Sequence, residues 1–151
     1  MRSAKTIGVV LSAAAVGALV AGCEKPPPAI TVWNGTGSVY APALCWAFEG
    51  SLQQGECAQE VIQGQAIDGV PTLTLAPGKT LGISVDPAVA EAGWQISADG
   101  QPLTAEPLDT TYYRVVADNT PDQALTLQVV AGREPEIRGV FLVRLQPEPT
   151  D

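Results

Sequence analysis

The chain of 151 residues contains no histidine, and its single methionine is Met1. Three cysteines are present, and none of them form a Cys-x-x-Cys pair. Metal sites in proteins are built mostly from histidine, thiolates and grouped carboxylates, and redox dithiols usually have the Cys-x-x-Cys spacing. Histidine is also the common base that activates a serine or cysteine nucleophile. We therefore expect a protein without a cofactor or a bound metal that is not an enzyme.

Basic residues are also scarce, because eight lysines and arginines stand against sixteen acidic residues. Two of these bases, Arg2 and Lys5, lie at the start of the chain, and without them the net charge of the remainder is −10. Such a surface repels phosphate backbones and disfavours flat binding to anionic lipid headgroups. No glycine-rich phosphate loop opens a helix. The composition thus predicts no nucleic-acid partner.

The chain has no apolar run long enough for a permanent membrane span. Residues 7–21 form an apolar run of fifteen residues, which as a helix extends about 22 Å against a hydrocarbon core of about 30 Å. A basic start, an apolar middle and a small-residue exit are typical of an export signal. We predict a helical signal peptide over residues 1–22. The alternatives are an uncleaved anchor, disfavoured by the short Ala/Gly-rich run, and cleavage at another site.

Cys23 directly follows Val20-Ala21-Gly22, and a cysteine after small residues resembles the lipobox of bacterial lipoproteins. The resemblance implies that the thiol of Cys23 receives a diacylglyceryl group and that Cys23 becomes the first residue of the mature chain. Two acyl chains such as palmitate, at about 0.8 kcal/mol per buried methylene, hold a domain on a bilayer almost permanently. The positive-inside bias then places the domain outside the cell, lipid-anchored to the outer face of the cytoplasmic membrane.

The other two cysteines, Cys45 and Cys57, are expected to form a structural disulfide, because an exported domain is exposed to an oxidising compartment. The bond would close a short loop and stabilise the fold by about 3 kcal/mol. Residues 23–28 contain Glu-Lys-Pro-Pro-Pro and predict a stiff polyproline tether. At about 3.1 Å per residue, this tether would hold the domain roughly 15 Å from the bilayer.

Short β-rich segments separated by turn dipeptides fill residues 29–146. Apolar residues recur at every second position in several segments, as in Leu73 and Leu75 or Val140 and Leu142. This pattern predicts an all-β single domain with an immunoglobulin-like antiparallel β-sandwich. Residues 147–151 are expected to form a disordered tail. Strands are expected at residues 30–33, 38–48, 59–65, 72–76, 80–85, 94–97, 111–117, 124–130 and 139–145.

Two local signals interrupt the strands. Asn34-Gly35 between the first two β-rich segments predicts a hairpin. Residues 86–93 predict one helical turn, with Asp86 as the N-cap, a proline at the first helical position and Gly93 as the terminator. We expect this turn to cross from one sheet to the other and to deliver Trp94 to the core.

The segment LAPGKTLGISVDPAVAEAGWQI, residues 75–96, resembles a family of small actinobacterial lipoproteins filed as domain of unknown function 2771. The likeness extends to the lipobox, the proline-rich spacer, the hairpin that ends in Val39-Tyr40-Ala41-Pro42 and the cysteine pair. The chain departs from the family at Asp86 and Gly93, where members often carry proline, and both departures fall in turns. The resemblance implies an exported, membrane-tethered domain with no assigned activity. Its most specific residues are Pro77, Gly78, Val85, Val89 and Trp94.

Aromatic side chains give the one indication of a binding surface. Strand alternation that buries Ile30 and Val32 turns Trp33 toward the opposite face, and exposed rings can stack on sugars or on a partner protein. The alternative is that the tryptophans cap the sandwich or cover the disulfide. The candidate binding patch comprises Trp33, Trp46 and Tyr112.

These observations together predict a non-enzymatic binding or interaction module of the cell envelope. Its expected partners are the membrane, through the lipid anchor, and an envelope protein or glycan. The first alternative is an accessory subunit of a membrane enzyme or transporter, which requires an exposed apolar patch near Trp33 and Trp46. An envelope hydrolase ranks third, since it needs two carboxylates about 5 to 10 Å apart in a cleft. Residues 118–122 offer oxygen ligands for calcium, but a plain turn explains them better.

Overall fold

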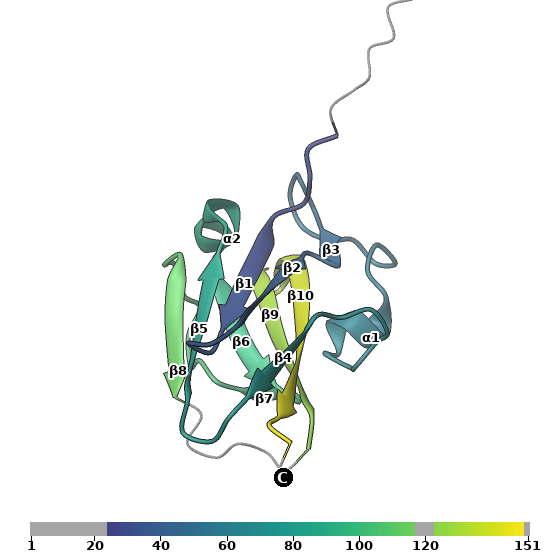
Figure 1. The fold of residues 1–151 in the computed structure, drawn as a ribbon. Coiled ribbons are helices and arrows are strands. Elements are labelled where there is room, and N and C mark those ends of the chain that lie inside the picture. The colour runs from purple at the N-terminus through teal and green to yellow at the C-terminus, as the bar shows by residue number, and fades with distance from the viewer. Residues whose placement is uncertain (1–23, 117–122, 150–151) are drawn as a thin grey trace, which may run out of the picture.

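Two β-sheets pack face to face in the computed structural model, which describes residues 24–116 and 123–149 (Figure 1). One sheet has four strands in the order β2-β1-β5-β8. The other has six strands, in the order β3-β10-β9-β6-β7, with β4 added alongside β10. The predicted all-β antiparallel sandwich of a single domain is confirmed. One pair departs from it, because β4 runs parallel to β10.

The four-stranded sheet contains the predicted hairpin. Its strands β1 (Ala29–Trp33) and β2 (Ser38–Pro42) are joined by a turn in which Asn34 Oδ1 accepts hydrogen bonds from the backbone N–H groups of Thr36 and Gly37. Gly35 in this turn has a φ of 91°, which favours glycine. The sheet is completed by β5 (Thr80–Val85) and β8 (Tyr112–Val116).

The six-stranded sheet is organised around its longest strand, β10 (Glu136–Pro147), which pairs with β9, β3 and β4. β10 reaches one residue into the segment predicted as a tail, and Glu148 and Pro149 after it are exposed. The remaining strands of this sheet are β3 (Cys45–Trp46), β4 (Thr72–Leu75), β6 (Trp94–Ala98), β7 (Gln101–Pro102) and β9 (Leu125–Arg133).

The predicted crossing turn is helix α2 (Pro87–Ala92), which connects β5 of one sheet to β6 of the other. Gly93 ends the helix with a φ of 78°. Asp86 occupies the N-cap position, as predicted, but its side chain caps no helical N–H. Its carboxylate instead accepts a hydrogen bond of 2.8 Å from the backbone N–H of Ala29, at the start of the neighbouring strand β1.

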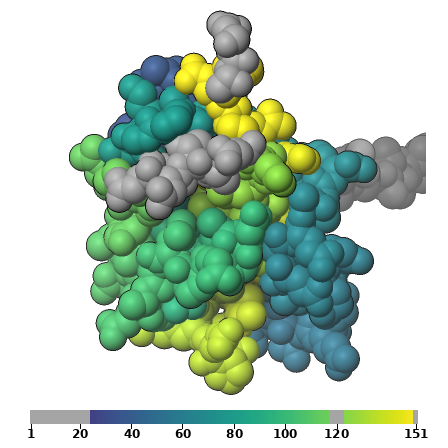
Figure 2. Space-filling view, turned by 90° about the horizontal axis from the view of Figure 1, so that it is seen from below, coloured from purple at the N-terminus to yellow at the C-terminus, as the bar shows by residue number. Residues whose placement is uncertain are grey.

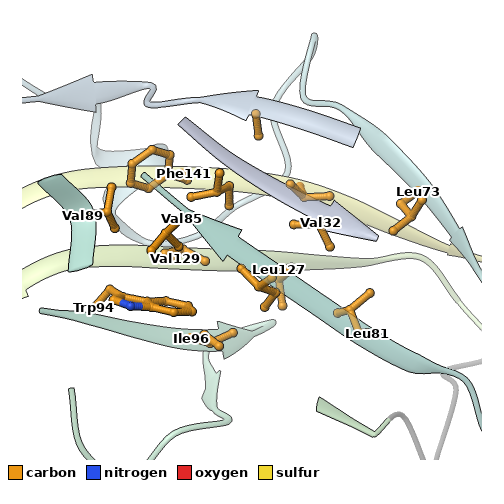
Figure 3. Close-up of a cluster of buried hydrophobic side chains, with 14 of the residues drawn as sticks. Val32, Leu73, Leu81, Val85, Val89, Trp94, Ile96, Leu127, Val129 and Phe141 are labelled. Atoms are coloured by element: carbon orange, nitrogen blue, oxygen red, sulfur yellow. The ribbon is translucent and has the colours of Figure 1, made fainter. Parts of the chain in front are cut away.

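The main core lies between the two sheets, and Trp94 is fully buried in it, as predicted. Figure 3 shows Trp94 and Val89 at one end of this core and Leu73 and Leu81 at the other. Trp94 Nε1 donates a hydrogen bond of 2.7 Å to the carbonyl of Thr110, so the indole N–H is satisfied.

β10 is buried on both faces. Phe141 and Val143 point into the main core, while Val140 and Leu142 belong to a second cluster on the outer side of the six-stranded sheet. A strand that is covered on both sides reads as a continuous apolar run. The predicted alternation at Val140 and Leu142 therefore describes only half of the apolar side chains that this strand buries.

Residues 59–65, predicted as a strand, instead contain helix α1 (Gln59–Ile62). Val61 is buried in the second cluster against β10, and Gln128 Nε2 donates hydrogen bonds of 2.9 Å to the carbonyls of Val61 and Ile62. These tertiary contacts stabilise the helix. It is too short for a helical repeat of apolar residues to be recognised in the sequence. Figure 2, seen from below, shows this part of the chain (blue to teal) as a lobe against the side of the sandwich.

Several predictions lie outside the described residues: the signal peptide over residues 1–22, the lipidation of Cys23, the turn at 118–122 and the end of the tail at 150–151. Within residues 24–116 and 123–149, no helix combines the length and the apolar character needed to cross a bilayer.

The predicted disulfide is present between Cys45 and Cys57, whose Cα atoms are 5.5 Å apart. It does not join the two sheets. Both cysteines belong to the second cluster, with Cys57 buried and Cys45 packed at its margin. The bond therefore fastens the loop between β3 and α1 to the outer side of β10.

Replacing Cys45 with serine should lower the free energy of unfolding by about 3 kcal/mol, because the unfolded chain regains the freedom of the closed loop. For a domain of this size, the melting temperature should fall by about 10 °C. Thermal unfolding followed by circular dichroism measures the change. Cys57→Ser and the double variant should show the same loss as Cys45→Ser, and an unchanged melting temperature in Cys45→Ser would contradict a stabilising bond.

Candidate functional site

The outer face of the four-stranded sheet brings together two of the three predicted binding residues. Ile30, Val32 and Ile83 point into the core, as predicted for β1, so the alternate side chains of these strands point outward. Trp33 is the register partner of Gly82, and its indole ring lies over that glycine. The missing side chain at Gly82 is what lets the ring lie flat on the sheet.

Trp33 is stacked with Tyr112 from β8, with ring centroids 6.2 Å apart and ring planes only 11° from parallel. Trp33 is half-buried, and Tyr112 is 39% exposed. We call this pair the aromatic platform. Arg114 is the register partner of Gly82 on the other side, so its side chain rises from the same face beside the rings.

Hydroxyl groups lie next to the platform on the same face. Thr31 and Ser84 are register partners on β1 and β5, and Ser84 is in turn the partner of Tyr112. Thr31 is flanked on its other side by Tyr40 of β2. One row across the sheet therefore reads Tyr40, Thr31, Ser84, Tyr112, with a phenol at each end and two aliphatic hydroxyls between them.

Trp46 does not belong to this patch, contrary to the prediction. It lies on β3 of the six-stranded sheet, opposite Gly139, with its ring over that glycine. The ring is tilted against Phe141 at 6.3 Å, and the guanidinium of Arg138 lies 5.4 Å from its centroid. Trp46 thus caps one end of the sandwich, which is the alternative role considered for it.

The exposed apolar residues near Trp46 were missed by sequence reasoning. Tyr40 is 66% exposed, Leu44 42% and Phe48 46%. All three fall in the segment 38–48 that was predicted as one strand, whose alternation is broken where β2 ends at Pro42 and β3 begins at Cys45. One sequence signal could have indicated them. Residues 38–48 contain more large apolar side chains than one buried face of a strand can accommodate.

A hollow on the outer side of the six-stranded sheet lies over β6 and β9, between α1 and the segment after β7. Its buried polar groups are hydrogen-bonded within the fold. Gln128 bonds to Val61, Ile62 and the Ser97 hydroxyl, and the Thr104 hydroxyl accepts a bond from the Ile96 N–H. These side chains connect elements of the fold rather than point at a ligand.

The carboxylates that hydrogen-bond to the backbone have structural partners. Glu56 accepts from the N–H of Gln53 at 2.7 Å, Asp86 from Ala29 at 2.8 Å and Asp99 from Thr126 at 2.8 Å. Glu49 and Glu56 both line a surface hollow beside the disulfide loop. In the described part of the chain, no group of three or more histidine, cysteine or acidic residues could hold a metal ion.

Comparison of the chain with protein-family models, with curated proteins and with solved structures found no match. The resemblance to the lipoprotein family therefore stays a prediction.

Adding a methyl group at Gly82 should displace the Trp33 ring. We expect Gly82→Ala to destabilise the domain by about 1 to 3 kcal/mol, the usual cost of overpacking. Gly37→Ala is the matched control, because its new Cβ would lie 3.8 Å from the nearest atom, an ordinary contact.

In a Trp33→Ala background the clash disappears, so Gly82→Ala should become neutral or slightly stabilising there. Chemical denaturation of the four proteins measures this cycle. Equal effects of Gly82→Ala in both backgrounds would contradict the contact between the ring and the glycine.

Proposed function

We propose that the protein is an extracytoplasmic lipoprotein, anchored through acylated Cys23, and that its sandwich is a non-enzymatic binding module of the cell envelope. The lipobox-like run before Cys23 supports the anchor. The observation that carries the binding role is the aromatic platform, in which Trp33 and Tyr112 stack on a sheet face whose neighbouring side chains are partly or fully exposed to solvent.

The chemistry of this face fits a glycan. Nearly parallel rings offer a flat apolar surface to the C–H face of a sugar, and the hydroxyls of Thr31 and Ser84 offer hydrogen-bond partners beside it. The net charge of −10 on the chain after the signal disfavours an anionic polymer. A neutral or weakly charged envelope polysaccharide is therefore the favoured ligand class.

Three acidic residues have structural partners, which fits a non-enzymatic role. Glu56, Asp86 and Asp99 each accept a backbone hydrogen bond, which commits these carboxylates to fixing loops and strand ends. A glycoside hydrolase would instead direct two carboxylates at one bond of the substrate.

Replacing Cys23 with alanine should move the protein out of the membrane fraction or leave it as an unprocessed precursor, because no thiol is available for acylation. Fractionation of cells and immunoblotting measure both outcomes. Cys45→Ser is the control, since it removes a cysteine without affecting the anchor. Normal processing and membrane retention of Cys23→Ala would contradict lipidation.

Tyr112→Ala should weaken binding to envelope polysaccharide about tenfold, since a stacked aromatic contact contributes roughly 1 to 1.5 kcal/mol beyond its buried area. Cosedimentation with insoluble cell-wall polysaccharide measures the affinity. Val116→Ala is the matched control, because Val116 is an exposed apolar residue on the same strand, away from the stacked rings. Failure of the unmodified protein to sediment, or equal sedimentation of Tyr112→Ala, would contradict the proposed ligand.

A further inference from the structure

The start of the domain is held in place before the first strand begins. Pro28 is buried, and its carbonyl accepts a hydrogen bond of 3.0 Å from the N–H of Ala43. The next residue, Ala29, donates its N–H to the carboxylate of Asp86. Pro28 is therefore part of the folded body and does not act as a spacer.

The two preceding prolines are exposed, but they lie beside the body. Pro26 and Pro27 line two surface hollows, and Trp46 and Phe48 line both of these hollows as well. Residues 23–27 then separate the buried Pro28 from an acyl chain on Cys23, and five residues span at most about 17 Å. The link is therefore short, and it leaves the body beside Trp46 and Phe48.

Apolar side chains surround the point where the chain leaves the body. We define the tether-end surface as Tyr40, Leu44, Trp46 and Phe48, of which Tyr40, Leu44 and Phe48 are 66%, 42% and 46% exposed. Trp46 and Phe48 line both hollows beside the proline segment, while Tyr40 lines one of them and Leu44 the other. Figure 1 shows the chain leaving the sandwich beside β3, at the end opposite to the tip of β8.

We propose that the tether-end surface rests in the headgroup layer of the bilayer that holds the lipid anchor. This inference rests on the proposed acylation of Cys23. The headgroup layer is about 5 to 8 Å thick on each side of the hydrocarbon core. A link of at most about 17 Å that leaves the body beside this surface keeps the surface within reach of that layer. Tyrosine and tryptophan are the residues that proteins place at this depth, because each has an apolar ring and a polar group.

The charges at this end indicate that apolar contact drives the docking. Lys25 and Arg138 line the hollow that also contains Asp86, and Glu24 lines the hollow beside Leu44. Bases and acids are thus mixed around the surface, and the whole mature chain is acidic. The tether-end surface should therefore dock on zwitterionic lipid and gain nothing from anionic lipid.

Docking in this way leaves the aromatic platform free, and only Tyr40, at the edge of the four-stranded sheet, belongs to both surfaces. β1 and β5 run from the tether end to the opposite end, since Val85 pairs with Ile30 near the tether and Thr80 pairs with Val116 at the far end. The four-stranded sheet is then parallel to the membrane normal, and the aromatic platform on its outer face points sideways, along the membrane plane.

The three tryptophans allow a direct test with the full lipidated chain. The protein is purified in detergent and reconstituted into phosphatidylcholine vesicles whose acyl chains are either unmodified or brominated, because bromine quenches only nearby tryptophans. Brominated lipid should reduce the emission of the unmodified protein and of Trp33→Phe. Trp46→Phe, which keeps Trp33 and the buried Trp94, should lose no emission. Adding phosphatidylglycerol should not increase the quenching.

Surface variants test the same contact without changing Trp46. Phe48→Ser should reduce the quenching of Trp46 while its melting temperature stays unchanged, because Phe48 is largely solvent-exposed. Val116→Ser is the matched control, since Val116 is 56% exposed at the opposite end of the sandwich and should leave the quenching unaltered.

Two results would overturn the inference, and flotation of the vesicles on a density gradient separates them. A protein that floats with the vesicles but is not quenched is lipid-anchored and stands clear of the bilayer. A protein that does not float lacks the anchor, so the proposed function and this inference both fail. Because the vesicles contain no other protein, quenching would also show that the tether-end surface contacts lipid without a membrane-protein partner.

Discussion

The point at which the chain enters the domain is fixed by two hydrogen bonds at the start of β1. The Pro28 carbonyl is bound by Ala43, and the Ala29 N–H is bound by Asp86. β1 itself lies between β2 and β5, with Ile30 and Val32 in the core, so the strand cannot turn without unfolding the sheet. The chain before Pro28 is consequently attached at a fixed point, and every surface of the sandwich has a fixed relation to it.

The three tryptophans of the sandwich lie in three different environments. Trp94 fills the core, where its indole N–H has a backbone partner. Trp33 lies on the outer face of the four-stranded sheet and Trp46 at the margin of the main core, and each ring lies over a glycine of the neighbouring strand, Gly82 and Gly139 respectively. A glycine in a strand lowers its stability slightly, but here it allows a large ring to bury one face while the other faces outward. The same arrangement, a tryptophan ring over a glycine, occurs at the proposed sugar-binding face and at the proposed membrane-facing end.

Sequence patterns that depend on neighbouring residues predicted the fold well. The Asn34-Gly35 hairpin, the crossing helix before Trp94 and the Cys45–Cys57 bond are all present, because turn chemistry, period-two alternation and cysteine spacing are local properties. Features that depend on distant partners were missed. Helix α1 is held by Gln128 and by the outer side of β10, and the carboxylate of Asp86 bonds to β1 rather than to its own helix.

The candidate site was predicted in part for the same reason. Alternation along β1 placed Trp33 on the outer face, but it could not reveal that β8 lies beside β5 and brings Tyr112 over to stack on it. Trp46 was grouped with them because strand alternation turns it away from Cys45, whereas the break between β2 and β3 places it in the other sheet. The burial of Pro28 was missed because three successive prolines show no alternation of apolar and polar residues, so the sequence does not indicate which of them packs against the domain.

The proposed function and the further inference both depend on the chemistry of Cys23, because the proposed anchor would be joined to the fixed attachment point only by residues 23–27. Intact mass spectrometry of the protein purified from membranes measures that chemistry directly. The account predicts a chain that begins at Cys23 and carries the added mass of a diacylglyceryl thioether. A chain that begins at Met1, or a free thiol at Cys23, would contradict it.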